Sequence, residues 1–435
     1  MIPMILVASF MVQPASAASE KIGIFVDGAI LVDADTGKIL YEENADTPLG
    51  IASMTKMMTE YLLFEAIEEG KVSWDQEYHV NDYTYKISQD GRLSNVPLRA
   101  DGVYTIKELY EALAIYSANA ATIGIAETIA GTETEFLKLM NQKAEELGLE
   151  DYKFVNSTGL NNADLQGMHP QGTGVDDENI MPAKSVAKLA YHLLHDYPEV
   201  LETTQIRTKN FREGTDDETK MDNWNFMLPG SVYEYEGVDG LKTGTTNFAG
   251  HSFTGTAKKN DKRLIAVVMK AVDDKGEGSY KARFDATRKL FDYGFAQFTE
   301  EELVPAGYQF DKQKTLKVNK GKADSVKIAL KDPIEMTVKA NEKDLYEAEL
   351  VLDESLLEDG KLQAPIEKGT VVGHVRMVHA EDGDYGYLKG EQYVGEVVAT
   401  ETVEKAGWFK LTMRAIGSFF SGLWGSVTDF IKGLF

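Results

Sequence analysis

The strongest constraint on the fold is a change of sequence pattern near residue 300. Residues 20–295 mix helical runs with β-type runs, whereas residues 303–400 hold only short β-rich runs, such as "SVKIAL" and "VVGHVRMVHA", between turn signals. Because helical periodicity is absent from the second stretch, we expect it to form a separate all-β domain, a small sandwich. A chain of 435 residues also exceeds one ordinary core, so two or three domains are expected.

The first stretch indicates an antiparallel sheet flanked by helices, an α+β domain over residues 18–297. The run "GAILVDADTGKILYEENAD" predicts two strands joined at Asp35-Thr36-Gly37, and residues 251–258 and 263–271 predict a second hairpin. Strands therefore lie at both ends of this stretch, with helices between them. The expected helices are 53–68, 106–116, 121–130, 134–147 and 183–195.

Both ends of the chain differ from the rest. Residues 1–17 form a short apolar run that closes on Ala15-Ser16-Ala17, which predicts a signal peptide, although no Lys or Arg precedes it. Residues 405–435 place aromatic and aliphatic side chains at helical spacing and carry four basic residues and one acidic residue. This pattern predicts an amphipathic helix that lies on a membrane surface. A terminal helix that packs on a core is the alternative interpretation.

The charge and the cysteine count exclude several classes of protein. A formal net charge of −25 argues against nucleic acid as a partner, because a basic face supplies most of that affinity. The chain has no cysteine, which excludes disulfides, thiolate zinc sites and a cysteine nucleophile. His192 and His195 share a helix face, but no third ligand is in view, so we expect neither a metal nor a cofactor.

The chemistry begins at Ser53 and Lys56, three residues apart at the head of an apolar helical run. This spacing puts both side chains on one face, and a serine at a helix N-terminus lies near unpaired N–H groups and the positive end of the dipole. A buried lysine of lowered pKa can act as the base that a serine nucleophile needs. An N-cap serine with an exposed lysine is the alternative, since S-x-x-K alone is a weak signal.

Two further motifs strengthen the catalytic interpretation. Ser117 and Asn119 form S-x-N in an expected loop between two helices, and Lys242-Thr243-Gly244 form K-T-G on an expected strand. S-x-x-K, S-x-N and K-T-G in this order are typical of penicillin-binding proteins and serine β-lactamases.

With these motifs the chain resembles the low-molecular-weight penicillin-binding proteins, serine-type D-alanyl-D-alanine carboxypeptidases of the penicillin-binding protein 5 type. The similarity covers nearly the whole chain and includes the β-rich domain and the terminal helix. It is carried by "LVDADTGKILYEENAD", "IASMTKMMT", "YSANAAT", "FVNSTGL" and "GVDGLKTGTT". The resemblance implies the same fold, a substrate that is a peptidoglycan stem peptide ending in D-Ala-D-Ala, and acylation by β-lactam antibiotics.

The resemblance also implies a role for each motif residue. Ser53 would attack the penultimate D-Ala carbonyl and form an acyl-enzyme, while neutral Lys56 accepts its proton. Ser117 would pass a proton to the leaving nitrogen, and Asn119 would position Lys56 and the substrate amide. Lys242, a second ammonium nearby, would help to keep Lys56 neutral by repulsion between like charges.

The K-T-G strand would bind the far end of the substrate. Lys242 and Thr243 would hold the terminal carboxylate, and the N–H groups of Thr245 and of the nucleophile would form the oxyanion hole. Many relatives have histidine at the position of Thr245, so this departure bears on turnover rate more than on reaction class. Arg283 either adds positive charge near the carboxylate or is a surface helix arginine.

Two other classes of function stay open from the sequence. A serine β-lactamase shares the acylation set but needs a deacylating base, for which Glu199 and Glu202 are loose candidates. A catalytically idle wall-binding protein could also carry this fold. A Ser-His pair with His251 is disfavoured, because no G-x-S-x-G is present, and we expect a strand histidine with a structural hydrogen bond. The acidic, cysteine-free chain with its terminal helix suits the outer face of a Gram-positive cytoplasmic membrane, and a periplasmic placement stays open.

Overall fold

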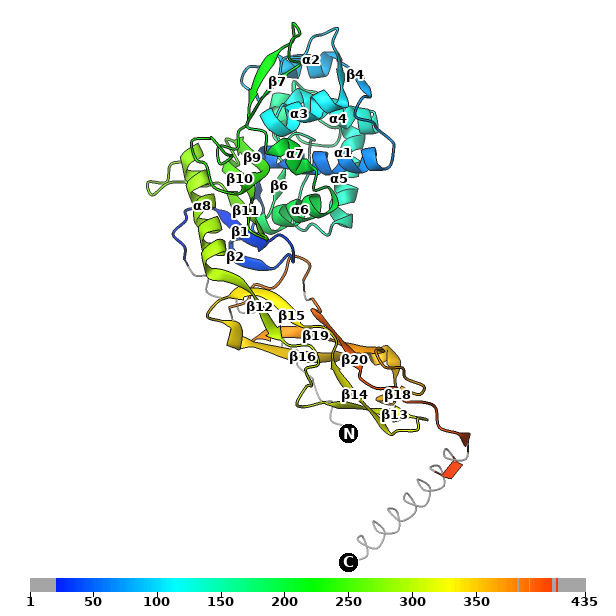
Figure 1. Ribbon diagram of the computed structural model, residues 1–435. Helices are drawn as coiled ribbons and strands as arrows, with labels where there is room; N and C mark the ends of the chain where they lie inside the picture. Colours follow the sequence, from blue (N-terminus) through cyan, green and yellow to red (C-terminus); the bar gives the residue numbers. More distant parts are fainter. Residues whose placement is uncertain (1–20, 382, 391, 409–411, 414–435) are drawn as a thin grey trace, which may run out of the picture. The chain divides into compact units, whose positions relative to one another are not determined.

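The computed structural model describes residues 21–381, 383–390, 392–408, 412 and 413. These residues form two compact units, which Figure 1 shows in the colours of the sequence. The first unit extends to Phe298 and also takes in the later segment 382–390, and the second unit starts at Thr299. Within the described ranges no helix is long and apolar enough to cross a membrane.

The first unit is built on a five-stranded antiparallel sheet in the order β2-β1-β11-β10-β9. Both predicted hairpins are present, and they are joined where the first strand of the unit pairs with its last. The sheet therefore brings the early strands β1 and β2 next to the late strands β10 and β11. Strand β9 forms one edge of the sheet. The strands are β1 Gly28–Asp33, β2 Ile39–Glu43, β9 Val238–Thr246, β10 Gly250–Lys259 and β11 Lys262–Met269.

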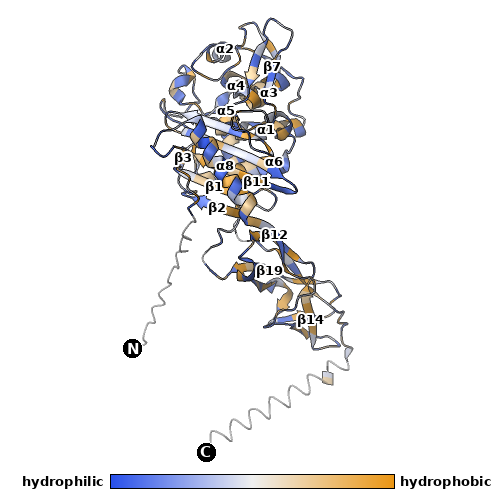
Figure 2. Cartoon of the chain, turned by 60° about the vertical axis from the view of Figure 1, so that its left-hand side comes forward, coloured by the Kyte–Doolittle hydropathy of each residue, from blue (hydrophilic) through white to orange (hydrophobic). Residues whose placement is uncertain are grey.

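Helices cover both faces of this sheet (Figure 1). In β1, Ile30 and Val32 belong to the cluster under α1 and α6, whereas Ala29 and Leu31 belong to the cluster under α8. Successive side chains of a strand point to opposite faces, so a strand between two layers must be apolar at every position. Hydrophobic residues accordingly gather inside the unit (Figure 2).

The predicted helices are present, with one correction at the first of them. The α-helix expected from Ser53 begins at Lys56, and Ser53 lies in a preceding 3-10 turn. The helix α3 begins where the sequence provides a capping box, in which Thr105 and Glu108 bond each other's backbone N–H groups. The helices are α1 Lys56–Glu68, α2 Asp82–Ser88, α3 Ile106–Tyr116, α4 Asn119–Ala130, α5 Glu133–Glu146, α6 Ala183–Asp196, α7 Val200–Thr204 and α8 Tyr280–Gln297, with 3-10 turns η1 Ala52–Thr55 and η2 Asn162–Leu165.

Three short antiparallel strand pairs complete the first unit. They are β3 Leu49–Gly50 with β6 Ile180–Met181, β4 Glu77–His79 with β5 Val103–Thr105, and β7 Thr208–Phe211 with β8 Thr219–Asp222. The late segment 382–390 adds to the β1–β2 hairpin. Buried Lys38 forms an ion pair with Asp384 at 2.8 Å, and Ile39 N–H donates to the Gly386 carbonyl at 2.9 Å.

The second unit is the expected all-β domain, built around Val326, Ile328, Val338 and Val375. Its larger sheet has seven strands in the order β16-β19-β20-β14-β13-β18-β17, and its smaller sheet pairs β12 with β15. The strands are β12 Phe298–Val304, β13 Thr315–Asn319, β14 Ser325–Leu330, β15 Ile334–Lys339, β16 Tyr346–Leu352, β17 Leu357–Glu358, β18 Lys361–Gln363, β19 Val371–His379 and β20 Gly395–Ala399, with 3-10 turns η3 Lys343–Leu345 and η4 Glu354–Leu356.

Candidate active site

Ser53 lies in the 3-10 turn that precedes α1. The loop at residues 156–160 packs closely against this turn. Gly159 in that loop has φ of +84°, and a Cβ there would stand 1.8 Å from the Ala52 carbonyl oxygen. Only glycine fits this approach. This close approach packs the loop directly against the turn that carries Ser53.

Lys56 is fully buried and reaches three oxygen atoms. Its Nζ lies 3.0 Å from Ser53 Oγ, 2.8 Å from Asn119 Oδ1 and 2.8 Å from the Thr158 carbonyl oxygen. These oxygens come from the turn before α1, from the start of α4 and from the 156–160 loop. The alternative of a solvent-exposed lysine is therefore wrong.

The surroundings of Lys56 favour its neutral form. Burial lowers the pKa of the Lys56 ammonium well below 10.5, and the positive charge of Lys242 lowers it further. The carboxylates of Glu60 and Glu133 act in the opposite direction, with smaller effect. The net result favours the neutral amine, which is the form that can accept a proton.

Ser117 and Asn119 stand at the junction of α3 and α4. Ser117 is the C-cap of α3 in the left-handed conformation, with φ of 61°, and it is 4% exposed. Asn119 is held by Ser94, whose carbonyl oxygen accepts from its backbone N–H at 2.9 Å and from its Nδ2 at 3.0 Å. This leaves the Asn119 Oδ1 directed at Lys56.

The K-T-G segment lies on the edge strand β9, as expected, and approaches the Ser53 turn closely. A Cβ on Gly244 would lie 2.6 Å from the Ile51 carbonyl oxygen, so glycine is required there. Lys242 is 3% exposed and Thr243 is 7% exposed, while Thr245 is exposed. Burial and the charge of Arg283 lower the Lys242 pKa to about 8, whereas Glu60 raises it.

Arg283 on α8 is buried against the K-T-G strand, so the surface alternative is wrong. Its Nη1 donates to the Gly244 carbonyl at 3.2 Å, to Thr245 Oγ1 at 3.0 Å and to the Ser252 carbonyl at 3.1 Å. No carboxylate pairs with this guanidinium among the residues that the structure describes. An arginine that is 1% exposed and lacks an acidic partner is well placed to attract an anion beside β9.

Two family comparisons bear on this arrangement. Residues 14–273 match the D-alanyl-D-alanine carboxypeptidase family, and residues 298–405 match the C-terminal domain of penicillin-binding protein 5. The chain belongs to the D-alanyl-D-alanine carboxypeptidase family. This carboxypeptidase family accounts for the α+β unit, and the second match accounts for the β domain.

Similar proteins cover most of this carboxypeptidase family member. D-alanyl-D-alanine carboxypeptidase DacF of Bacillus subtilis is 32% identical over 391 residues, or 90% of this chain and 89% of that protein. A peptidoglycan synthesis regulatory factor of Streptococcus pneumoniae is 36% identical with a TM-score of 0.69, over 88% of this chain and 100% of that structure. Penicillin-binding protein D2 of Listeria monocytogenes, solved with ampicillin bound, is 31% identical with a TM-score of 0.52, over 63% and 100%.

Other residues of this carboxypeptidase site gave no usable signal in the sequence. Glu133 on α5 and Ser94 in the loop after α2 reach this site only through folding, whereas Glu60 follows Lys56 by one turn of α1. Thr158 lies in the "FVNSTGL" run, which carried part of the family resemblance, but the bond from Lys56 to its backbone carbonyl depends on folding. His251 is on β10, but its buried Nδ1 has no hydrogen-bond partner in the described part of the chain, so the expected structural hydrogen bond is wrong. It instead packs edge-on against Tyr280.

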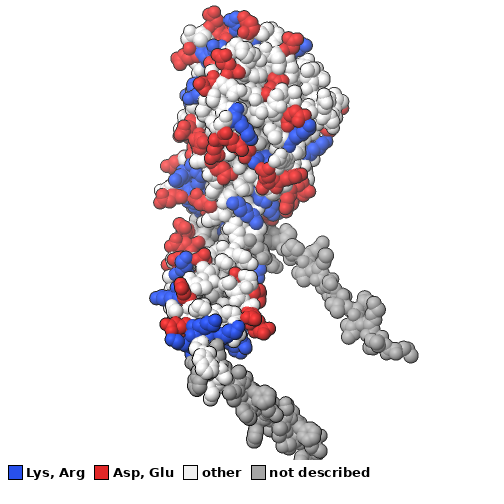
Figure 3. All heavy atoms as spheres, turned by 90° about the vertical axis from the view of Figure 1, so that its right-hand side faces the viewer, with Lys and Arg blue, Asp and Glu red and all other residues white. Residues whose placement is uncertain are grey.

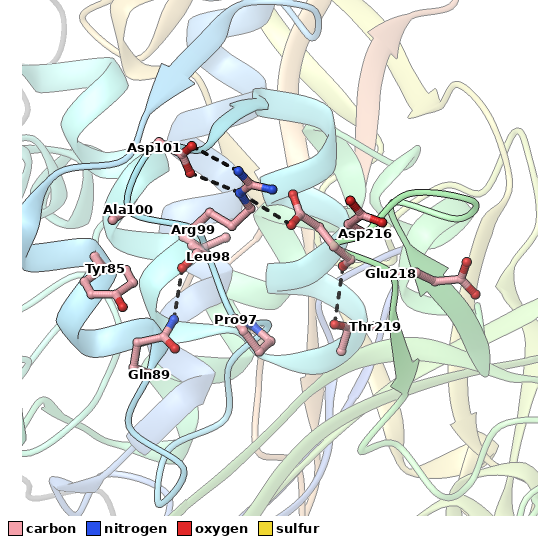
Figure 4. Close-up of a pocket in the computed structure, with 11 residues that line it drawn as sticks. Tyr85, Gln89, Pro97, Leu98, Arg99, Ala100, Asp101, Asp216, Glu218 and Thr219 are labelled. Carbon is pink, nitrogen blue, oxygen red and sulfur yellow. Dashed lines mark hydrogen bonds and ion pairs between the residues drawn. The ribbon is translucent and has the colours of Figure 1, made fainter.

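A separate hollow of about 440 Å³ lies between the loop after α2 and the β7–β8 hairpin (Figure 4). Arg99 stands in it and bonds Asp101 in bidentate fashion at 3.0 Å, and Asp217 lies 3.9 Å from the same guanidinium. None of the predicted catalytic residues lines this hollow. Glu199 and Glu202, the candidates for a β-lactamase base, are exposed at the start of α7.

Proposed function

We propose that this protein is a serine D-Ala-D-Ala carboxypeptidase that removes the terminal D-Ala from peptidoglycan stem peptides through an acyl-enzyme on Ser53. The observation that carries the proposal is the set of three oxygen atoms around Lys56 Nζ. No cofactor takes part in the proposed reaction.

The three contacts of Lys56 select the direction of proton transfer. A neutral amine has two N–H donors and one lone pair. The Thr158 carbonyl and the Asn119 amide oxygen can only accept, so they take the two N–H donors. The lone pair is then left for the hydroxyl of Ser53, which donates to it across 3.0 Å. Ser53 Oγ becomes nucleophilic as its proton moves to Lys56, and the new bond forms to the penultimate D-Ala carbonyl carbon.

Recognition of the terminal carboxylate follows from the charges beside β9. Lys242, Thr243 and Thr245 supply an ammonium and two hydroxyls along one edge strand, and Arg283 supports them from α8. A free D-alanine carboxylate at this edge gains charge-assisted bonds that an internal peptide bond lacks. The site therefore favours removal of a C-terminal residue over internal cleavage.

The remaining steps use groups at the same junction. The backbone N–H groups of Ser53 and Thr245 stabilise the oxyanion, with Thr245 contributed by the edge strand. Ser117 passes the proton of Lys56 to the leaving D-Ala nitrogen, and Asn119 holds both Lys56 and the substrate amide. Water then attacks the acyl-enzyme and releases the shortened peptide. A penicillin forms the same bond to Ser53, but its leaving group stays attached and hinders water.

D-alanine release from a diacyl-Lys-D-Ala-D-Ala peptide tests the proposal. Purified protein from residue 18 onward should release D-alanine, which a coupled D-amino acid oxidase assay detects. No release would move the assignment to a β-lactamase or an idle wall-binding protein. The lifetime of the penicillin adduct then separates these, because loss within seconds indicates a β-lactamase and no adduct indicates an idle protein.

Replacing Arg283 by methionine should weaken substrate binding more than chemistry. The guanidinium acts by charge on the carboxylate, so loss of about 1.5 kcal/mol, or roughly a tenfold rise in KM, is expected with a smaller change in kcat. Steady-state kinetics with the diacyl peptide measure both. The matched control is Arg288→Met on the same helix, whose guanidinium bonds the Tyr233 and Glu234 carbonyls. An equal KM for Arg283→Met and the parent would contradict the role.

The same proposal places the enzyme outside the cytoplasm, on the outer face of the cytoplasmic membrane of a Gram-positive cell. The predicted signal peptide at residues 1–17 lies outside the described residues. Nearly all of the predicted helix at residues 405–435 lies outside them as well. Support comes from the described start of this segment, where the Ala406 N–H donates to the Lys320 carbonyl and Lys405 pairs with Gly321 of the second unit. Figure 3 shows basic side chains gathered at this end of the second unit, on a surface that is otherwise rich in acidic residues.

Removing residues 405–435 should release the protein from anionic vesicles without loss of D-alanine release. The basic and aromatic residues of this segment supply the expected affinity for the membrane interface. Vesicle co-sedimentation at low and high salt measures it, with full-length protein as the control. Undiminished vesicle binding by the shortened protein would refute the anchor.

A further inference from the structure

Glu60 is a buried carboxyl group that the reaction described above does not use. It lies on α1 one turn after Lys56 and is 1% exposed. Its Oε1 has no hydrogen-bond partner in the described part of the chain. Burying a carboxyl group without a partner costs free energy, so the sequence would be more stable with an apolar or amide side chain there.

The charges around Glu60 come from several elements. Lys56 on α1 and Lys242 on β9 are the two cations whose fields reach it. Burial raises the pKa of Tyr110 on α3, and the negative charge of Glu60 raises it further. Of the two lysines, Glu133 on α5 acts on Lys56, and its oxygens already accept hydrogen bonds from Ser157 and Tyr83.

The two lysines must hold different protonation states for the proposed reaction. Lys56 has to be neutral to accept the serine proton, whereas Lys242 has to stay charged to bind the carboxylate. Burial works against charge on both, and Arg283 adds repulsion at Lys242. The hydrogen bonding of Lys242 is also weak, since its contact with the Thr243 carbonyl is 3.3 Å long. Among the charges that act on Lys242, that of Glu60 is the one that favours the protonated form.

We propose that Glu60 is a positioning residue that keeps Lys242 protonated through its negative charge, without touching substrate. With Glu60 ionised, Lys242 charged and Lys56 neutral, this buried trio has no net charge. The carboxylate makes no ion pair with either lysine in the described part of the chain, so it acts through the low-dielectric interior rather than through a bond. This inference rests on the proposed function, because it concerns the same two lysines.

The inference predicts a pH profile with a specific asymmetry. The acid limb of kcat/KM reports loss of the proton from Lys56, and the alkaline limb reports loss of the proton from Lys242. Burial raises the pKa of Glu60 from 4.5 to about 7, so its charge is present on the alkaline side. Removing that charge lowers the Lys242 pKa and moves the alkaline limb toward acid, while the acid limb moves less.

The test is Glu60→Gln, which keeps the shape of the side chain and removes its charge. We expect the alkaline limb for D-alanine release to move about one pH unit or more toward acid. The loss at pH 9 should appear as a raised KM, and the two enzymes should converge near pH 6.5. Glu60→Asp should return the limb toward the parent value. Glu65→Gln, on the same helix but paired with Lys143 at the surface, should leave the profile unchanged.

The thermal stability of Glu60→Gln gives a second test. The proposed electrostatic role predicts a higher Tm for this variant, whereas a purely structural role for Glu60 predicts a lower one. Since folding raises the Glu60 pKa from 4.5, this group favours the folded state fully below pH 4.5, and that contribution is lost as pH rises through about 7. Glu60→Gln should therefore raise Tm relative to the parent more at pH 8 than at pH 5. A loss of Tm at both pH values would show that Glu60 is structural.

The outcomes separate this inference from the proposed function. A parent enzyme that releases no D-alanine refutes the function. An active parent with an unmoved alkaline limb in Glu60→Gln refutes only the inference. The inference is supported if the alkaline limb shifts toward acid in Glu60→Gln and returns toward the parent position in Glu60→Asp.

Discussion

Replacing Ser53 by alanine should abolish D-alanine release and penicillin acylation, with a loss in kcat of at least about 10³-fold. The hydroxyl is the Ser53 side-chain group that contacts Lys56 Nζ, and the amine keeps its bonds to Asn119 and Thr158 without it. The fold should therefore survive while the nucleophile is lost. Mass spectrometry of the intact protein after penicillin treatment measures the adduct, and the coupled oxidase assay measures release.

A buried serine away from the site provides the matched control for this result. Ser88 on α2 accepts from the Leu98 N–H at 3.1 Å and takes no part in the proposed reaction. Ser88→Ala should keep its adduct and most of its turnover, even if its Tm falls. A penicillin adduct on Ser53→Ala would assign the nucleophile to another residue and overturn the acyl-enzyme on Ser53.

Replacing Lys56 by arginine should slow acylation by about 10²- to 10⁴-fold, the usual contribution of a general base. A guanidinium stays protonated at every accessible pH, so it has no lone pair to offer the serine hydroxyl. The Lys56 amine is fully buried and has three oxygen atoms within 2.8 to 3.0 Å. The larger, planar guanidinium group of arginine fits poorly among these atoms. Stopped-flow measurement of penicillin acylation from pH 6 to 10 gives the rate.

The pH dependence distinguishes a lost base from a damaged site. The slow acylation of Lys56→Arg should not recover at high pH, because arginine does not titrate there. Lys143→Arg is the control, since Lys143 pairs with Glu65 and Glu146 on the far side of α1 and should retain parental acylation. Near-parental acylation by Lys56→Arg would remove lysine as the base and make a different proton acceptor necessary.

Local patterns explain why much of the architecture was predictable. The continuous buried run of β1, the capping box at Thr105 and the change of sequence pattern near residue 300 are properties of neighbouring residues. Hydrophobic periodicity and turn chemistry act over a few residues, so they can be read without knowing what folds against them. The three motifs were visible for a related reason, since each is short and contiguous.

Steric contacts between distant segments set details that those patterns missed. The first α-helix was expected from Ser53, but the serine lies in a 3-10 turn against which the backbone of Gly159 packs closely. His251 was expected to form a structural hydrogen bond, but α8 presents the ring of Tyr280 to it instead. Arg283 could not be assigned to surface or interior until α8 was seen against β9.

The sequence by itself determined the order of the elements, the all-β character of the later part and the identity of the motif residues, because these depend on local pattern. The tertiary structure alone decided that Lys56 meets Thr158 and Asn119, and that the charge of Glu60 acts on Lys242. Burial and the fields of distant charges set the protonation of a lysine, and neither is a property of its sequence neighbours. The chemistry of this site is therefore a consequence of folding, whereas its residues are a consequence of sequence.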